Sequence, residues 1–365
     1  MEGNYKDHLF ILILAGGGGT RLWPKSRNKT PKQFLPIFLE KKTLIQLTFS
    51  RFKQLVPEDR IFCVTVSEEY KKEIIRELPE FKKENIIVEP ARRETGPAHA
   101  LGAYIIKNID PDAVIITEAS DRLVSPVHRY LQVLKAAAEV AYTKKVLVAL
   151  GVSPRYPHTG LGHIKRGDRL EDVGDVAFFK LEKFVEKPPL ELAKKYTESG
   201  DYYWNAGEFV WRADTLLDEI KKYAPEIAKQ IQRLEDGEKI EDVYKDMPKI
   251  AIDYAVAEKS KNFYVVHGDF NWTDIGDWKG VWENSKKDSL GNVILDDGEK
   301  GGEIINIDTS DALIYKNGRM IAVIDVDNII VVDTDDALLI CSKSRAQNVK
   351  RVVERLKEEN RTDLL

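Results

Sequence analysis

Short runs of apolar residues alternate with longer amphipathic stretches through the first part of the chain. Apolar runs rich in β-branched residues predict buried strands, and apolar residues spaced three and four apart predict helices. The predicted strands are residues 9–15, 61–66, 85–89, 113–119 and 146–152. The predicted helices between them include 43–56 and 67–78, the second with Ser67 as its N-cap. This order predicts a doubly wound, mostly parallel α/β sheet with its ligand site at the carboxyl ends of the strands.

The pattern becomes less regular over residues 151–260, where a strand at 180–187 and several helices up to 250–259 are predicted. The last quarter changes again, and three of its segments resemble one another: 307–315, 324–332 and 332–340. Each has an apolar residue and an Asp, a polar corner and an apolar run. Their starts lie 17 and 8 residues apart, which predicts the coils of a small β-solenoid, with an antiparallel meander as the alternative.

A tail helix is predicted over 346–360. Its apolar residues form one narrow stripe: Val349, Val352, Val353 and Leu356. Such a stripe suits docking on the solenoid or on a second subunit, so a homodimer is expected. We therefore expect a catalytic domain over residues 1–285 and a smaller domain over residues 286–365.

The composition is that of a globular protein, with 43% hydrophobic and 32% charged residues among 365. The net charge of −4 argues against a general nucleic-acid binder. The apolar stretch 9–15 is too short to span a membrane, no later stretch is longer, and a signal-peptide pattern is lacking. The two cysteines, Cys63 and Cys341, both lie in apolar runs and predict buried thiols. Together these features predict a cytoplasmic protein that binds neither nucleic acid nor membrane.

The most unusual stretch is "LAGGGGTRLWPKSRNKTPKQF", residues 14–34. Neither the mechanical P-loop pattern nor the dinucleotide-binding glycine pattern fits any register of its four glycines. What remains is a bare turn whose backbone N–H groups could bind an anion, with an ordinary wide turn as the alternative. The cations that follow favour the anion: Arg21, Lys25, Arg27, Lys29 and Lys32. Pro24 and Pro31 stiffen this segment, and holding so many cations together is costly without an anionic ligand.

This stretch resembles the signature of the sugar-phosphate nucleotidylyltransferases, in the version typical of the mannose-1-phosphate guanylyltransferases. Six further blocks resemble that family in the expected order: 89–103, 119–122, 184–188, 204–211, 251–259 and 269–278. The resemblance spans residues 9–341, nearly the whole chain. It implies a Rossmann-like nucleotide-diphospho-sugar transferase fold with a left-handed β-helix-like C-terminal domain.

The resemblance also implies a reaction, the transfer of GMP from GTP to mannose 1-phosphate to give GDP-mannose and pyrophosphate. The sugar phosphate oxygen is already an anion, so it attacks the α-phosphorus in line without a general base. Transfer between another nucleotide and another hexose 1-phosphate is the nearest alternative. A catalytically silent paralogue that binds nucleotide sugars is a more distant one.

By the same resemblance, Arg21, Lys32 and Lys187 would be the catalytic cations, although a solvated surface is the usual place for such residues. The nucleotide would be lined by Leu14, Ala15, Gly16, Gly17, Gly18, Gly19, Thr20 and Ser120, with Glu89 and Thr95 near the base. The sugar would be bound by Gly162, Glu186 and Asn205.

A magnesium ion is expected at Asp121 and Asp274, because Mg²⁺ often takes one or two carboxylates together with substrate phosphates. The alternatives are a helix N-cap for Asp121 and a turn for Asp274. Arg122 stands where the family usually has His, and Leu161 and His163 replace aromatic residues near the sugar. His163 itself is expected to be a structural, hydrogen-bonded residue.

Overall fold

The computed structural model describes residues 4–38, 42–296 and 301–365, which form two compact units. The first unit contains the described residues of Met1–Gly16, Ser50–Ser120 and Val124–Trp272. The second contains the described residues of Gly17–Phe49, Asp121–Leu123 and Thr273–Leu365. Among the described residues, no helix is both long enough and apolar enough to cross a membrane.

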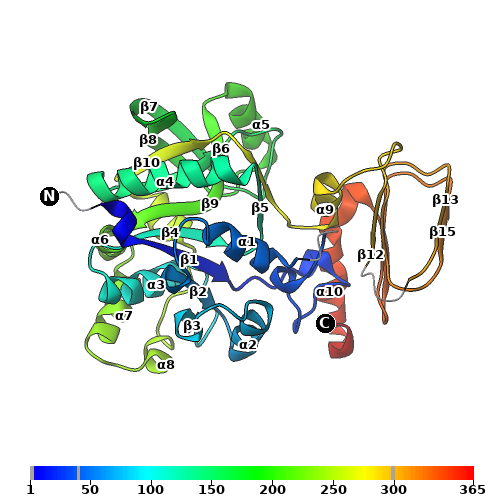
Figure 1. Ribbon diagram of the computed structural model, residues 1–365, viewed down its shortest axis with the longest axis horizontal. Coiled ribbons are helices and arrows are strands. Elements are labelled where there is room, and N and C mark those ends of the chain that lie inside the picture. The colour runs from blue at the N-terminus through cyan, green and yellow to red at the C-terminus, as the bar shows by residue number, and fades with distance from the viewer. Residues whose placement is uncertain (1–3, 39–41, 297–300) are drawn as a thin grey trace. The chain divides into compact units, whose positions relative to one another are not determined.

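The first unit is built on a nine-stranded sheet in the order β3-β2-β1-β4-β9-β6-β10-β8-β7 (Figure 1). Its strands are β1 (Leu9–Ala15), β2 (Ile61–Thr65), β3 (Ile86–Val88), β4 (Val114–Ala119), β6 (Leu147–Val152), β7 (His163–Val173), β8 (Val176–Val185), β9 (Tyr202–Arg212) and β10 (Phe263–Gly268). Strands β1 to β4 are parallel, as predicted, and β6 is parallel to β10. Strand β9 runs antiparallel between β4 and β6, which makes the sheet mixed. All five strands predicted from apolar runs are therefore confirmed.

Helices cover both faces of this sheet. Helix α4 packs on one face, while α3 and α6 pack on the other (Figure 1). The helices of the first unit are α2 (Glu68–Glu77), α3 (Thr95–Ile109), α4 (Val127–Lys144), α5 (Leu190–Ser199), α6 (Ala213–Tyr223), α7 (Pro225–Glu235), α8 (Ile240–Val243), the π-helical η6 (Asp253–Ala257) and the 3₁₀ turns η1 (Tyr5–His8), η4 (Glu58–Arg60) and η5 (Lys83–Asn85). The Tyr70 N–H donates to the Ser67 hydroxyl at 3.2 Å, so the predicted cap of α2 is confirmed. The helix expected over 250–259 contains only the π-helical turn and Ile252.

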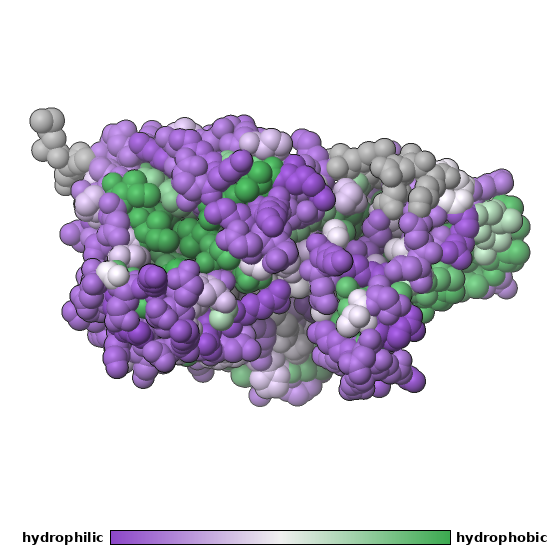
Figure 2. Space-filling model, turned by 90° about the horizontal axis from the view of Figure 1, so that it is seen from below, coloured by the Kyte–Doolittle hydropathy of each residue, from purple (hydrophilic) through white to green (hydrophobic). Residues whose placement is uncertain are grey.

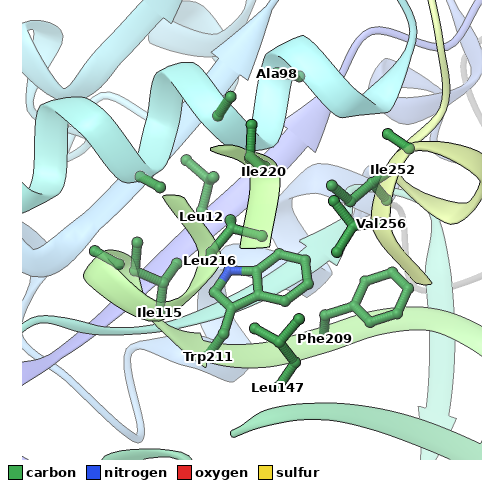
Figure 3. Close-up of a cluster of buried hydrophobic side chains, with 14 of the residues drawn as sticks. Leu12, Ala98, Ile115, Leu147, Phe209, Trp211, Leu216, Ile220, Ile252 and Val256 are labelled. Carbon is green, nitrogen blue, oxygen red and sulfur yellow. The ribbon is translucent and has the colours of Figure 1, made fainter. Parts of the chain in front are cut away.

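The core between the sheet and α3 and α6 is centred on β9 (Figure 3). Phe209 and Trp211 are alternate residues of this strand, so both point to the same face, and their rings stack with centroids 5.0 Å apart. Leu12 of β1 and Ile115 of β4 lie beside them, under Ile220 of α6. Helix α3 packs tightly on β1 at Gly102, where an added Cβ would lie 2.4 Å from a methyl group of Leu12.

The second unit contains two small sheets, β12-β14-β16-β17 and β13-β15. Their strands are β12 (Val293–Asp296), β13 (Ile304–Ile307), β14 (Leu313–Lys316), β15 (Ile321–Ile324), β16 (Ile329–Asp333) and β17 (Leu338–Ser342). Strands β14 and β16 pair in parallel with Leu313 opposite Ile330, and β13 and β15 pair with Ile304 opposite Ile321. Both registers reproduce the 17-residue offset of the sequence repeat, so the solenoid is confirmed for the first two segments.

The third repeat segment, 332–340, is not a further coil. The chain turns after Asp333, and β17 returns antiparallel to β16, with Asp333 opposite Leu338. The prediction of a third coil is wrong because Thr334 closes a tight turn, with its N–H donating to the Ala337 carbonyl. Strand β17 is thus an edge strand, and Cys341 on it is only half-buried instead of buried as predicted. Cys63 is fully buried, as predicted.

The tail helix α10 (Val349–Glu358) docks within the second unit. Val349 and Val353 are buried against the solenoid strands β14 and β16 and against Leu22 and Trp23. The helices of this unit are η2 (Thr20–Leu22), η3 (Lys32–Phe34), α9 (Trp278–Asn284), η7 (Lys343–Asn348), α10 and η8 (Thr362–Leu364), and α1 (Leu44–Phe52) contains residues of both units. A two-stranded sheet of β5 (Arg122–Ser125) and β11 (Asn271–Asp274) also contains residues of both. Docking of the tail helix on the solenoid is confirmed.

Candidate active site

The glycine run follows the carboxyl end of β1. Gly19 has a left-handed backbone with φ of 64°, and a Cβ there would lie 2.6 Å from the Cβ of Lys32. A Cβ at Gly16 would lie 2.9 Å from a methyl group of Val66. Packing therefore explains these two glycines. Added Cβ atoms at Gly17 and Gly18 would meet no described atom within 4 Å, so the backbone here is open to a ligand.

Three residues predicted to line the nucleotide lie at the carboxyl ends of β1 and β4 in the first unit. The Ser120 N–H donates to the Leu14 carbonyl at 3.0 Å, and the Ala15 carbonyl accepts a hydrogen bond from the Thr65 hydroxyl at 2.9 Å. Thr20 is exposed at the start of η2. Leu14, Ala15 and Ser120 thus lie together at the carboxyl edge of the sheet, where a site is expected in this architecture.

A group of five charged side chains lies within the second unit. The Lys32 ammonium contacts Asp121 Oδ2 and lies 3.5 Å from Asp274 Oδ1. One guanidinium nitrogen of Arg122, Nη1, lies 2.8 Å from Asp274 Oδ1 and 3.7 Å from Asp121 Oδ1. The Arg21 guanidinium stands beside Gly276, close enough to act on the charge of Asp274. Predicted Lys32, Asp121 and Asp274 are brought together, and Arg122 joins them as a residue without a predicted role.

The charges of this group stabilise one another in a largely buried place. Burial by itself raises the pKa of Asp274, but Arg122 and Lys32 hold that pKa well below its usual range. Burial lowers the pKa of Lys32, and the carboxylates of Asp121 and Asp274 more than reverse this. The buried Oδ1 of Asp121 makes no hydrogen bond to the described residues, which leaves an acceptor for a cation. No group of three acidic, His or Cys side chains suited to a metal occurs among the described residues, so a cation here needs ligand oxygens as well.

The residues predicted to bind the sugar and its phosphate lie within the first unit. Gly162 is wedged between Glu186 and Asn205, because an added Cβ would lie 2.6 Å from Glu186 Oε2 and 3.2 Å from the Asn205 Cβ. The Asn205 N–H donates to the Gly162 carbonyl at 2.8 Å. Lys187 donates to Glu186 Oε1 at 2.6 Å and has a left-handed backbone with φ of 47°, which is uncommon for a residue with a side chain. The structure thus brings together four residues predicted for the sugar and its phosphate.

Asp253 completes this set and was missed by the sequence analysis. Its Oδ1 accepts a hydrogen bond from the Asn205 amide at 3.1 Å, while Asn205 Oδ1 accepts one from the Gly207 N–H at 3.1 Å. The two bonds fix which way the amide faces. Burial, helped by the nearby Glu186 carboxylate, raises the pKa of Asp253 to about 7. The available signal was an Asp within the apolar run 250–257.

The two residues predicted near the base have partners in the protein. Glu89 follows β3, is buried, and accepts a hydrogen bond from the Tyr244 hydroxyl at 3.0 Å. Burial raises the pKa of Glu89 to about 7. Thr95 begins α3, and its hydroxyl accepts a hydrogen bond from the Ile252 N–H at 3.0 Å. Their contact with a base stays a prediction.

A buried polar cluster also lies within the first unit, and its centre is the Tyr130 hydroxyl. This hydroxyl lies 2.8 Å from Glu118 Oε2 and 3.0 Å from Glu208 Oε2. Arg51 pairs with Glu118, and the Trp272 indole N–H donates to Glu208 Oε1 at 3.0 Å. The three strands β4, β9 and β11 are joined here.

His163 has the structural role predicted for it, and His99 is bonded in the same way. The ring nitrogen Nδ1 of His99 lies 2.6 Å from the Thr95 carbonyl, and that of His163 lies 3.1 Å from the Leu161 carbonyl. Burial lowers the pKa of both rings, to about 4 for His99. Three tryptophans of the predicted motifs are buried: Trp23, Trp272 and Trp278.

Two family models match the chain. The model described as "Nucleotidyl transferase" matches residues 11–290. The model described as "MannoseP isomerase/GMP-like beta-helix domain" matches residues 302–356.

The chain is also similar to proteins of known name over nearly its whole length. It is 35% identical to a mannose-1-phosphate guanylyltransferase of Escherichia coli K12, covering 98% of this chain and 75% of that protein. It is 35% identical to a mannose-1-phosphate guanylyltransferase of Salmonella typhimurium, covering 97% and 74%. A solved structure, described as a mannose-1-phosphate geranyltransferase from Thermus thermophilus, superposes with a TM-score of 0.85. It shares 32% identity, and the match covers 96% of this chain and 99% of that one.

Two glycines of the run should respond differently to alanine. Gly19→Ala should lower the free energy of unfolding by about 2 kcal/mol or more, because the left-handed backbone and Lys32 both oppose a Cβ. Gly17→Ala meets no described atom and should leave it within about 0.5 kcal/mol or slightly raise it. Urea denaturation measures both, and equal stability of the two variants would contradict this account of the loop.

Glu89→Gln should change how stability depends on pH. A carboxyl whose pKa is raised from 4.5 to about 7 favours the folded state below pH 4.5 and loses that contribution as the pH rises through 7. The glutamine keeps an acceptor for Tyr244 and carries no charge. We expect this variant to exceed the natural protein by about 2–3 kcal/mol at pH 8 and to lose the advantage toward pH 5. Denaturant unfolding at each pH checks this, with the exposed Glu84→Gln as control; parallel pH profiles for Glu89→Gln and the natural protein would refute it.

Proposed function

Because the chain belongs to the nucleotidyl transferase family, in the group of the mannose-1-phosphate guanylyltransferases, we propose that it makes GDP-mannose. In this reaction GMP passes from GTP to mannose 1-phosphate, and pyrophosphate leaves. The observation that carries the proposal is the convergence of Lys32, Asp121 and Asp274, from segments far apart in the sequence, beside the open glycine backbone. Two polyanions require positive charge at the site, which Lys32 and a cation held by the two carboxylates would supply, since catalysis of phosphoryl transfer rests mainly on positioning and electrostatics.

In the proposed mechanism, a phosphate oxygen of mannose 1-phosphate attacks the α-phosphorus in line. That oxygen is ionised near neutral pH, so the protein need not supply a base. Arg21 and Lys32 stabilise the charge that moves to the departing pyrophosphate, and Lys187 neutralises the sugar phosphate. The open N–H groups of Gly17 and Gly18 approach the nucleotide, which a Cβ would prevent. Glu89 and Thr95 are assigned to the guanine by family resemblance.

We assign Mg²⁺ to Asp121 and Asp274. The free acceptor on Asp121 and the ionised state of Asp274 suit a hard cation, and bound phosphate oxygens would complete its ligands. When bound, the ion would neutralise phosphate charge and polarise the reacting phosphoryl group. Lys32 and Arg122 pair with the same carboxylates in the structure described, so they share this place with the ion.

The sugar is assigned to Gly162, Glu186, Asn205 and Asp253. Asn205 has one N–H and one oxygen lone pair left after its bonds to Asp253 and Gly207, which suits a sugar hydroxyl that both donates and accepts. Glu186 adds a carboxylate acceptor beside them. A polyol ligand needs several directed partners of this kind, because a buried polar group without a partner costs free energy.

The substrate assignment is tested with a panel. GTP, ATP, UTP and dTTP are each combined with mannose 1-phosphate and glucose 1-phosphate, and pyrophosphate release is measured with and without Mg²⁺. GTP with mannose 1-phosphate should give the highest kcat/KM, and omission of Mg²⁺ should abolish turnover. A preference for UTP or dTTP would overturn the guanylyl assignment, and the absence of turnover with every pair would overturn the enzyme assignment.

Asp121→Asn and Asp274→Asn should each lower kcat by about 100-fold or more, because a neutral amide holds a divalent cation poorly. The Mg²⁺ concentration for half-maximal rate should rise in parallel. Asp325→Asn, at an exposed solenoid corner with φ of 52°, is the matched control and should keep full activity. The unfolding midpoint is measured for each variant, and full activity of either Asp121→Asn or Asp274→Asn would refute the metal assignment.

We further propose that the enzyme is a cytoplasmic homodimer. The described cysteines, Cys63 and Cys341, form no disulfide, in keeping with a reducing compartment. The outward face of β13 and β15 is apolar, with Ile305, Ile307 and Ile324 exposed, and Figure 2 shows hydrophobic residues at the right-hand edge of that view, where these strands lie. An uncharged strip of this kind can pair with its copy about a two-fold axis. Light scattering would give the mass, and a monomer would contradict the proposal.

A further inference from the structure

The cations after the glycine run divide into two groups by what they contact. Arg21 and Lys32 lie with the carboxylates of the charged group, whereas Lys25 and Arg27 contact the C-terminal part of the second unit. The Lys25 ammonium lies 4.8 Å from the centre of the Tyr315 ring on β14. One guanidinium nitrogen of Arg27, Nη2, donates to Asp336 Oδ1 at 2.7 Å, in the turn between β16 and β17. Lys29 is exposed.

Further hydrogen bonds attach the same loop to the C-terminal segment. The indole N–H of Trp23 donates to the Leu364 carbonyl at 2.9 Å, and Arg27 also donates to this carbonyl. The indole N–H of Trp278 donates to the Trp23 carbonyl at 2.9 Å. Leu22 and Trp23 are buried beside Val349 and Val353 of α10. The loop is therefore held from both its backbone and its side chains by residues that follow it by more than 250 positions.

Arg21 also contacts the C-terminal segment, at Gln347. Its Nη1 donates to Gln347 Oε1 at 2.7 Å, and the Gln347 amide nitrogen donates to Asp277 Oδ2. Asp277 is itself fixed as the N-cap of α9, because its Oδ1 accepts a hydrogen bond from the Gly280 N–H at 2.9 Å. The amide of Gln347 faces a carboxylate with its donor and a guanidinium with its acceptor, so only one orientation satisfies both partners.

We propose that Gln347 is a positioning residue for nucleotidyl transfer, which holds the Arg21 guanidinium beside Asp274 and Gly276 before GTP binds. This inference rests on the proposed function, in which Arg21 stabilises the departing pyrophosphate. A long, flexible arginine loses rotamer freedom when it binds a phosphate, and a partner that orders it beforehand lowers that cost. The C-terminal segment is thus a part of the phosphate site, and its contribution reaches the reaction through Arg21.

The central experiment compares Gln347→Ala with the natural protein by pyrophosphate release from GTP and mannose 1-phosphate. We expect kcat to fall by about 10- to 100-fold, as expected when a reacting group loses its alignment. The KM for mannose 1-phosphate should stay unchanged, because Arg21 is assigned to the other substrate. Lys350→Ala, an exposed change on the neighbouring turn of α10, is the matched control and should behave like the natural protein.

A double-mutant cycle separates positioning from a general structural role. In an Arg21→Ala background, Gln347→Ala should cause no further loss, because the residue it positions is gone. A loss of equal size in both backgrounds would overturn the proposal, as would a kcat within about 2-fold of the natural value, which is the scatter of neutral changes. An increase in kcat would also overturn it, because the contact between Gln347 and Arg21 would then slow the reaction and not assist it.

Trypsin cleavage of the folded protein provides a readout that does not depend on activity. Gln347→Ala should be cut faster between Lys25 and Lys29 than the natural protein, because release of Arg21 loosens the loop. If the natural protein turns over no nucleotide, the proposed function fails, while faster cleavage still supports the contact. Unchanged cleavage together with unchanged kcat in an active enzyme would refute the positioning role alone.

Discussion

The buried cluster around Tyr130 is the constraint from which the arrangement of the first unit follows. Glu118 and Glu208 are both fully buried, and two carboxyl groups in such a place are costly unless each has partners. Arg51, the Tyr130 hydroxyl and the Trp272 indole supply them. The cluster can therefore form only when α1, α4, β4, β9 and β11 are all in place. Asn205 lies three residues before Glu208 on β9, so the same cluster also holds the strand that carries Asn205.

Much of the fold could be predicted because parallel strands buried on both faces are continuous apolar runs, such as residues 9–15. Strand β9 was not predicted, although it is almost wholly buried, because Asn205 and Glu208 interrupt its apolar pattern. Asn205 is buried with the predicted sugar-binding residues, and Glu208 is buried in the Tyr130 cluster. Such polar residues break the local pattern that a buried strand otherwise shows. The repeat at an offset of 17 residues could be recognised because each parallel coil places its apolar residues at the same inward-facing positions. The segment that contains β17 has a similar composition, but it pairs antiparallel to β16 and is not a coil.

The candidate site was predictable only as far as residues lie in family motifs. Lys32, Asp121 and Asp274 were identified in this way, and the structure brings them together. Arg122 and Asp253 also lie in family blocks, but the sequence around them does not show which residues they contact, because those partners are 152 and 48 positions away. Gln347 is the extreme case, an exposed polar residue 326 positions from the arginine that it contacts.

The burial of Leu22 and Trp23 beside α10 has a consequence for how such a protein can change over generations. The loop near the start of the chain and the tail at its end form one apolar core, so each limits the substitutions that the other tolerates. Recombination that exchanges only the 3′ part of the gene would pair a loop with a tail to which it is not fitted. The two ends of the coding sequence are expected to be inherited as a matched pair, although almost the whole gene lies between them.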